Sequence, residues 1–147
     1  MALLRVIIRD PIKDEEDSIT ICVRNMTENV LRAINLIKSP SQLTVYSNNN
    51  AYILPIADIF YVESVDLKTF VYTENTIYQA KQKLYEVESI LNDSEFLRIN
   101  RQTIINIRRI QNVSPAGGGR FQATLTNGEK LIVSRQNVSA LKEIFGL

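Results

Sequence analysis

The stretch "FLRINRQTIINIRRIQNV", residues 96 to 113, alternates apolar and polar side chains over much of its length. Successive side chains of a β-strand point to opposite faces, so Leu97 and Ile99 fall on one face of an extended chain and Arg98 on the other. A helix would instead repeat its apolar residues every three or four positions. The stretch therefore predicts strands of a sheet with one apolar face and one cationic face.

Runs of the same kind surround this stretch from residue 43 onward. The glycines of "PAGGG" and the Asn-Gly pair of "TNGE" supply the positive φ that tight hairpins need. Apolar side chains at helical spacing predict one helix at 82–91 and another from about residue 136. The sequence thus predicts a mainly β domain with small helices. Its strands are expected at 43–47, 51–55, 59–64, 69–73, 76–81, 96–99, 103–107, 109–114, 120–126 and 130–134.

Residues 1–40 have a different predicted order of elements from the rest of the chain and are expected to form a short β-β-α extension. Strands are predicted at 3–9 and 18–24, on either side of an acidic loop. A helix is predicted from Thr27, which caps it, to Lys38. Because this helix is short and carries an apolar stripe, we expect it to pack on another surface and to contribute to dimerisation.

A linker is predicted in "KSPSQ", where serine and proline interrupt the helical pattern. The expected domain organisation is therefore an extension at 1–40 and a β domain at 43–147.

Composition argues against several kinds of catalysis. The chain has no histidine, the commonest general base and transition-metal ligand. No window approaches the roughly 20 apolar residues of a membrane-spanning helix, and the N-terminal apolar run is too short for a signal peptide. The single cysteine, Cys22, lies in the apolar run "ITICV", which predicts a buried thiol. We expect a cytoplasmic protein that is not an enzyme and has no metal or small-molecule cofactor.

Charge is distributed unevenly along the chain. Residues 1–95 hold 9 Lys and Arg against 14 Asp and Glu, whereas residues 96–147 hold 8 against 2. A cluster of cations without an intervening acid fits the phosphates of a nucleic acid, although a solvated sheet face has the same pattern. The C-terminal third is therefore expected to bind an anionic partner. The clustered cations are Arg98, Arg101, Arg108 and Arg109.

Four stretches, in this order, resemble the LytTR-type DNA-binding domain of bacterial transcription regulators. They are "IADIFYVES", "YQAKQKLYEVE", "FLRINRQTIINIRRI" and "NGEKLIVSRQNVSALKEIF". The most specific parts are the Phe-x-Arg-x-x-Arg-x-x-x-x-Asn string from Phe96 to Asn106 and the Val-Ser-Arg that ends at Arg135. The resemblance spans residues 43–147. It implies an elongated fold of antiparallel strands in successive small sheets, whose loops enter adjacent major grooves of duplex DNA.

The resemblance also implies which residues contact DNA. Base or backbone contacts are expected from Lys68 or Thr69, from Arg101, and from Arg135 with Gln136 beside it. Asn100 and Gln102 stand where the family often has His and Ser, so they are expected to alter sequence preference, and Asn106 is expected to make a structural hydrogen bond. With the arginine cluster, the expected set is Lys68, Thr69, Arg98, Asn100, Arg101, Gln102, Arg108, Arg109, Arg135 and Gln136.

Arg135 lies between a predicted strand and a predicted helix, so its backbone is expected to be held on both sides. That suits a bidentate contact with guanine O6 and N7. The alternative is that Ser134 or Asn137 caps the helix while Arg135 points into solvent.

The function expected from the sequence is regulation of transcription by a homodimer bound to two repeated half-sites of duplex DNA. Too few residues precede the domain for the receiver domain found in many family members, so the stand-alone type is expected. Two alternatives stay open. One is a β-domain whose arginine face meets an acidic protein. The other is a binder of single-stranded nucleic acid or RNA, which needs exposed aromatics, whereas Phe96 and Phe121 are expected in the core.

Overall fold

The structure, a computed structural model, describes residues 8–10, 12–14, 19–38, 42–91 and 95–147. The chain divides into two compact units, Met1–Asn35 and Leu36–Leu147. The proposed division into an extension at 1–40 and a domain at 43–147 stays a prediction. No helix in the described ranges is long and apolar enough to cross a membrane.

Helix α1 (Glu28–Lys38) begins in the first unit. The predicted cap is confirmed, because Thr27 Oγ1 accepts a hydrogen bond from the Val30 backbone N–H at 3.3 Å. Val30 is buried, and an ion pair of 3.1 Å joins Arg32 to Glu28 one turn earlier on the exposed side. Both features stabilise the first turns of a short helix.

The strand predicted at 18–24 is wrong over its described part, because residues 19–24 form no strand. The strand predicted at 3–9 lies mostly outside the described residues, and residues 8 and 9 are not in a strand. Cys22 is exposed, so the predicted buried thiol is also wrong. An alternating pattern forms a stable strand only when another strand pairs with it. Of the β-β-α extension, the described residues thus show only the helix.

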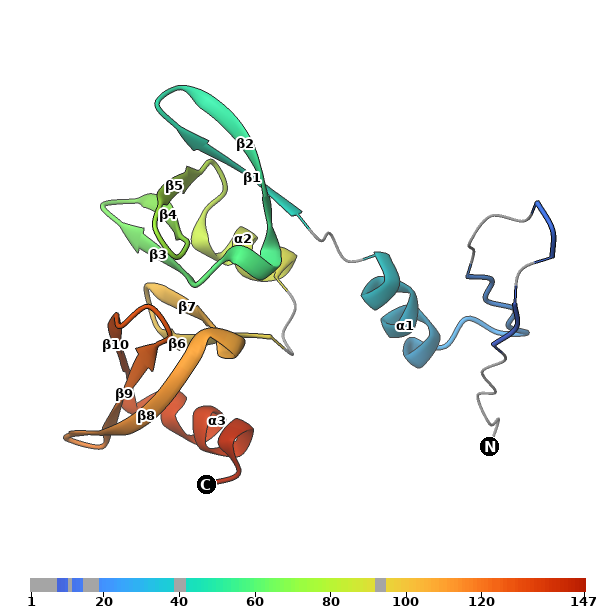
Figure 1. Ribbon diagram of the computed structural model, residues 1–147. Coiled ribbons are helices and arrows are strands. Elements are labelled where there is room, and N and C mark those ends of the chain that lie inside the picture. The colour runs from blue at the N-terminus through green and yellow to red at the C-terminus, as the bar shows by residue number, and fades with distance from the viewer. Residues whose placement is uncertain (1–7, 11, 15–18, 39–41, 92–94) are drawn as a thin grey trace. The chain divides into compact units, whose positions relative to one another are not determined.

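The second unit begins with a seven-stranded antiparallel sheet in the order β2-β1-β5-β4-β3-β7-β6 (Figure 1). Two-residue turns join β1 to β2, β3 to β4 and β6 to β7. Between β1 and β2 the turn residues Asn48 and Asn49 have φ of 49° and 64°, a conformation that asparagine tolerates. The strands are β1 (Gln42–Ser47), β2 (Asn50–Pro55), β3 (Tyr61–Val65), β4 (Lys68–Tyr72), β5 (Ile77–Ala80), β6 (Phe96–Asn100) and β7 (Thr103–Asn106).

Three helical segments connect or cover these strands. A 3-10 helix at Ile56–Asp58 leads from β2 towards β3, and a second at Ile107–Arg109 leads from β7 into the next sheet. Helix α2 (Leu84–Ile90) lies between β5 and β6 in the chain and packs beside the first sheet (Figure 1).

A three-stranded sheet in the order β10-β9-β8 follows, and helix α3 packs beside it (Figure 1). Its elements are β8 (Ile110–Gly117), β9 (Arg120–Leu125), β10 (Lys130–Val133) and α3 (Arg135–Phe145). The predicted strands from residue 43 onward and both predicted helices are therefore confirmed, with small shifts at their ends. The mainly β fold with antiparallel sheets is confirmed as well.

The second unit has two apolar cores, and the first sheet contributes to both through β3, β6 and β7. Phe96 belongs to the core under α2, whereas Ile99 belongs to the core formed with the second sheet and α3. A register irregularity between Arg98 and Asn100 accompanies this division. The face of β6 that carries Arg98 was predicted to be a cationic face that points outward. Arg98 departs from that prediction, because it is only partly exposed and its guanidinium is paired with Glu88 of α2.

Candidate nucleic-acid interface

Three connections that are distant in sequence lie beside one another in the second unit. They are the β3–β4 turn, the β6–β7 turn and the junction of β10 with α3. The Ser64 backbone N–H at the end of β3 donates to the Gln102 carbonyl at 2.8 Å. The Ser134 backbone N–H donates to the Ile99 carbonyl at 2.8 Å. The backbone itself therefore holds the three connections together, and we call them the loop strip.

Asn100 holds the β6–β7 turn from within. Its Oδ1 accepts a hydrogen bond from the Gln102 backbone N–H at 2.8 Å, and its Nδ2 donates to the Ile132 carbonyl of β10 at 3.2 Å. Both polar atoms of the amide are thus engaged inside the chain. Arg101 and Gln102, at the tip of the turn, are exposed. Of the residues predicted in this turn, these two have exposed side chains, while Asn100 supports the turn.

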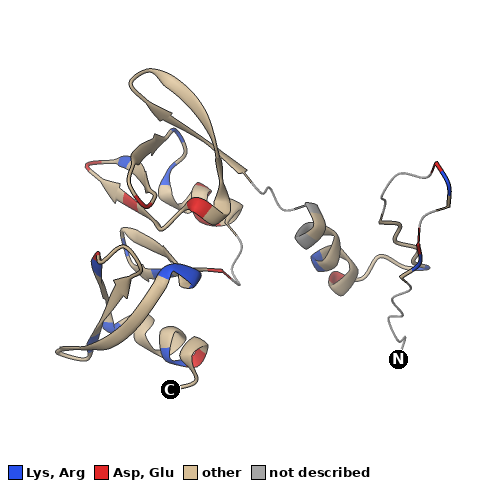
Figure 2. Ribbon diagram, in the orientation of Figure 1, with Lys and Arg blue, Asp and Glu red and all other residues tan. Residues whose placement is uncertain are grey.

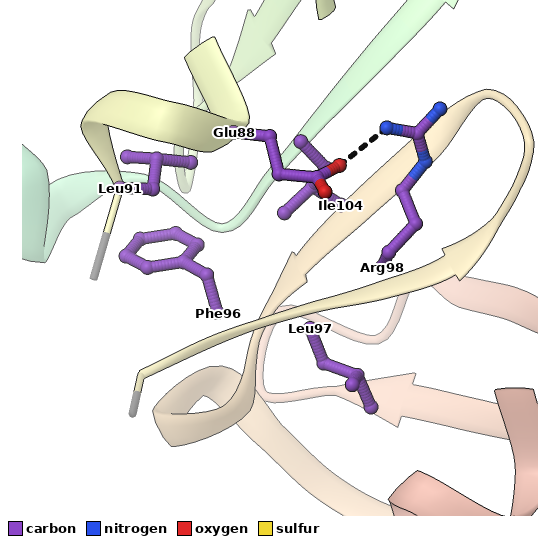
Figure 3. Close-up of a pocket in the computed structure, with 6 residues that line it drawn as sticks. All are labelled: Glu88, Leu91, Phe96, Leu97, Arg98 and Ile104. Carbon is purple, nitrogen blue, oxygen red and sulfur yellow. Dashed lines mark hydrogen bonds and ion pairs between the residues drawn. The ribbon is translucent and has the colours of Figure 1, made fainter. Parts of the chain in front are cut away.

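Arg98 points back towards the fold. Its Nε donates to the Asn100 carbonyl at 2.8 Å, and its two terminal nitrogens contact the Arg101 carbonyl and the Glu88 carboxylate. In Figure 3, Glu88 reaches from α2 towards the guanidinium of Arg98, while Leu97 points to the opposite side of the strand. The guanidinium therefore braces the turn that carries Arg101.

The two residues predicted at the β3–β4 turn differ in solvent exposure. Lys68 is exposed, whereas Thr69 is only 3% exposed. A partner that approaches this turn can therefore reach the Lys68 side chain, and Thr69 contributes to the interior of the sheet. The turn itself consists of Asp66 and Leu67, and Leu67 is completely exposed.

Arg135 is the first residue of α3, one position earlier than predicted, and β10 ends at Val133. The prediction that strand and helix hold its backbone is therefore confirmed. Ser134 occupies the cap position without a side-chain hydrogen bond to the helix backbone, and its Oγ accepts from Asn137 Nδ2 at 2.7 Å. Arg135 and Gln136 are exposed. They line an open hollow whose rim also includes Asn100, Arg101, Gln102, Ser134 and Asn137.

Arg108 and Arg109 do not belong to the loop strip. They follow the end of β7 that lies away from the β6–β7 turn, about 13 Å along a four-residue strand. Arg108 is paired with Glu95 at 2.8 Å, and its side chain is 76% exposed. Arg109 donates to the Ala57 carbonyl at 2.7 Å and lies 4.9 Å from the centre of the Phe60 ring.

The four arginines predicted as one stripe therefore have different surroundings. Arg101 lies in the loop strip, Arg98 and Arg109 fold onto the chain, and Arg108 lies elsewhere on the surface. Figure 2 shows Lys and Arg over both sheets of the second unit, with acidic segments among them. The cationic character of the loop strip comes from a few exposed side chains, not from a uniformly basic face.

Asn106 makes the structural hydrogen bonds predicted for it. It is 2% exposed, and its Nδ2 donates to the Ile59 carbonyl at 2.8 Å. Its Oδ1 accepts from the Arg108 backbone N–H at 3.0 Å, at the start of the 3-10 helix. The asparagine thus joins the chain before β3 to the end of β7.

Tyr61 and Tyr72 stack on neighbouring strands with ring centroids 4.1 Å apart. The Tyr72 hydroxyl donates to Glu63 at 3.2 Å. Burial raises the pKa of Tyr61, and the charge of Glu129 and a hydrogen bond to it raise this pKa further. Burial and then Glu63 raise the pKa of Tyr72 in the same way. Both phenols therefore stay neutral at physiological pH.

Several residues near the loop strip were missed by sequence reasoning. Leu67 stands in a two-residue turn where glycine or asparagine is usual, a signal that the sequence "VDLK" offers. Arg120, exposed at the start of β9, and Gly119 were taken only as the tip of a hairpin. The contact of Gly119 with Arg135 had no sequence signal, because it joins two separate connections. The described residues contain no group of three or more His, Cys, Asp or Glu arranged to hold a metal ion.

Comparison with known proteins gives one consistent family. The family model of the LytTr DNA-binding domain matches residues 49–146 of the sequence. The sensory transduction protein LytT of Enterococcus faecalis is 26% identical over 138 residues, which cover 90% of this chain and 57% of that protein. The sensory transduction protein LytR of Staphylococcus haemolyticus is 32% identical over 105 residues, which cover 71% of this chain and 41% of that protein. The chain thus spans about half the length of these relatives.

A solved structure agrees with the sequence matches. A LytTr DNA-binding domain from Bacillus cereus superimposes with a TM-score of 0.69 at 28% sequence identity. The match covers 74% of this chain and 99% of that domain. The resemblance found in the sequence is thereby confirmed for the part of the chain that carries the two sheets, α2 and α3.

Proposed function

Because this chain belongs to the LytTR DNA-binding domain family, we propose that it regulates transcription by binding a specific sequence of duplex DNA. The observation that carries the proposal is the loop strip, which presents Lys68, Arg101 and Arg135 from three separate connections. We assign it a non-catalytic role in the bacterial cytoplasm.

The exposed side chains of the loop strip suit the edges of base pairs. Arginine makes bidentate hydrogen bonds with guanine O6 and N7, and glutamine makes them with adenine N6 and N7. Arg135 and Gln136 start α3 one residue after the end of β10, so a strand and a helix hold the backbone that presents them. An anchored backbone lowers the entropy that is lost when such a contact forms. Arg135 is therefore assigned to guanine, and Lys68 and Arg101 to bases or phosphates beside it.

Arg108 is assigned a different role. Its exposed guanidinium lies outside the loop strip, beside Glu95, and suits a phosphate contact. Phosphate contacts position a protein on DNA without distinguishing bases, and each neutralised phosphate adds about 0.9 to the slope of log affinity against log salt.

Selection of binding sites from random duplexes tests the assignment. Arg135→Ala and Arg108→Ala each remove one arginine, so they form a matched pair. Arg135→Ala should keep the fold and lose preference at one base pair per half-site, a discrimination of about 1 to 3 kcal/mol. Arg108→Ala should weaken binding to all sequences about equally and keep the selected sequence. If Arg135→Ala selects the same sequence as wild type, Arg135 does not contact a base.

Binding as a homodimer at two repeated half-sites is part of the proposal. Helix α1 supports it, because it is an 11-residue helix with exposed Leu31 and Ile37 and is too short to be stable alone. Sedimentation of the full chain and of a chain that starts at Gln42 tests this role. Weaker association of the shortened chain would support it, and equal association would refute it.

The rival functions make different predictions. A binder of single strands needs aromatic side chains on which bases stack, and none of the residues that line the hollow is aromatic. A β-domain that binds an acidic protein should ignore DNA. Mobility shift of an arbitrary duplex at low salt separates this rival from the proposal, because a DNA-binding domain retains salt-sensitive non-specific binding.

A further inference from the structure

The β3–β4 turn is unusual in its second residue. Asp66 and Leu67 form a two-residue connection between Val65 and Lys68, which pair across the hairpin. Both turn residues have positive φ, 50° at Asp66 and 65° at Leu67. Hairpin turns of this kind normally use asparagine, aspartate or glycine, because a larger side chain crowds the neighbouring carbonyl when φ is positive. Asp66 follows this preference and Leu67 does not.

Burial within the fold does not stabilise the leucine side chain. Leu67 is 100% exposed, so none of its apolar surface is removed from water within the chain. Stability alone would favour glycine or asparagine at this position. An unfavourable backbone conformation and a fully hydrated aliphatic side chain at the same residue indicate a role outside the folded chain.

The position of Leu67 identifies the kind of partner. The turn lies next to the β6–β7 turn, because the Ser64 backbone N–H bonds to the Gln102 carbonyl at 2.8 Å. Apart from Val65, which is 41% exposed, the neighbouring exposed side chains are charged or polar, namely Asp66, Lys68, Arg101 and Gln102. The major groove presents mainly hydrogen-bonding groups, and its one apolar group is the C5-methyl of thymine.

We propose that Leu67 packs against the C5-methyl group of a thymine in the major groove and thereby selects that base pair. This inference rests on the proposed function and adds an apolar base contact to it. The hairpin holds the leucine at its tip, so contact with the methyl group needs no rearrangement of the chain.

Replacement of thymine by deoxyuridine tests the contact, because it removes only the methyl group. The probe is the duplex selected by the full wild-type chain from a random library. Each thymine is replaced in turn, and affinity is measured by fluorescence anisotropy. Wild type should lose about fourfold at one thymine per half-site, which corresponds to about 0.8 kcal/mol for one buried methyl group. In Leu67→Asn the same replacement should have no effect.

Two controls separate this role from a structural one. Leu67→Asn should unfold at the same or a higher urea concentration than wild type, since asparagine accepts positive φ and no packing is lost. Leu147→Asn changes another exposed leucine, beyond the end of α3, and should keep the full response to deoxyuridine.

The outcomes distinguish this inference from the proposed function. If no replacement weakens wild type, or if the weakening persists in Leu67→Asn, Leu67 contacts no thymine methyl. A marked loss of stability in Leu67→Asn would also overturn the inference, because the leucine would then serve the fold. Loss of base preference in Arg135→Ala together with any of these results leaves the proposed function standing. If selection yields no preferred duplex, both proposals fail.

Discussion

The aliphatic stem of Arg135 lies directly against the backbone of Gly119. A Cβ added at Gly119 would be 3.0 Å from Arg135 Cδ and 3.1 Å from Cγ. The glycine belongs to the β8–β9 hairpin, whose tip reaches the place where β10 ends and α3 begins, since Val133 pairs with Phe121. Contact along the stem restricts the conformations of this exposed arginine, so its guanidinium is held in fewer orientations before a partner binds.

Gly119→Asn should therefore displace Arg135 and weaken its base preference. We expect a fall of roughly fivefold at the base pair that Arg135→Ala affects, since about 1 kcal/mol of discrimination corresponds to that ratio. Asparagine is chosen because it tolerates the φ of +76° at this position. The measurement is competition between the selected duplex and its single-base variants.

Gly118→Asn is the matched control for this change. Gly118 has φ of +63°, and the nearest atom to an added Cβ is Arg120 Nε at 3.9 Å. This variant should carry a similar backbone cost and keep the base preference. Equal effects of the two variants would show that the hairpin turn, and not contact with Arg135, matters. In an Arg135→Ala background, Gly119→Asn should cause no further loss of base preference, because the arginine side chain that it displaces is absent.

The second prediction concerns the ion pair between Arg98 and Glu88. Glu88→Gln should loosen the turn that Arg98 braces. The ratio of specific to non-specific affinity should then fall by about threefold, which corresponds to the free energy that a partly exposed ion pair contributes. Loss of one negative charge also strengthens binding to any DNA. Glu74→Gln at an exposed turn removes the same charge and should leave the ratio unchanged. Equal ratios in the two variants would contradict a role for Arg98 in positioning the turn.

The third prediction concerns Asn106. Asn106→Ala leaves the Ile59 carbonyl and the Arg108 N–H without their side-chain partners. The hydrogen bond to Ile59 is buried and the one to Arg108 is partly buried. An unsatisfied buried group costs about 1 to 3 kcal/mol and a partly buried one costs less, so the free energy of unfolding should fall by about 2 to 4 kcal/mol. Urea denaturation measures it. Asn112→Ala, on an exposed position of β8, should change stability by less than about 0.5 kcal/mol. A loss no larger than that control would mean that the two hydrogen bonds contribute little.

The sequence predicted the strands of the second unit well because their alternation is local. Leu43 and Val45 are buried on either side of the exposed Thr44, as a half-buried strand requires. The turns were equally local, since Gly128 and the glycines at 117–119 supply positive φ. The resemblance supplied the order of the connections and the place of Arg135. These parts of the fold depend on residues a few positions apart.

The surroundings of the cations could not be predicted in this way. Arg98 turns inward because Glu88 lies above it on α2, and no alternation within β6 reveals a helix that covers one face. Arg109 folds onto Ala57 and Phe60, which precede it by about fifty residues. The strand expected at 18–24 had the right alternation, yet no described strand pairs with it. Tertiary contacts decide the surroundings of these arginines and the pairing of this strand, and local patterns in a single sequence do not reveal such contacts.

The last prediction concerns stability at alkaline pH. Burial, and then Glu129, raise the pKa of Tyr61 above its ordinary value of about 10. The folded chain therefore keeps this proton at pH values where the unfolded chain has lost it. Since stability falls with pH wherever the folded state binds more protons, the free energy of unfolding should decrease as pH rises above about 10. Tyr61→Phe keeps the stacked ring without the ionisable hydroxyl, so its decrease between about pH 9 and about pH 11 should be smaller than in wild type. Tyr85→Phe, at a tyrosine that is 65% exposed, should follow wild type. Urea denaturation across this range provides the measurement, and identical pH dependence in Tyr61→Phe and wild type would rule out Tyr61 as a source of the alkaline loss.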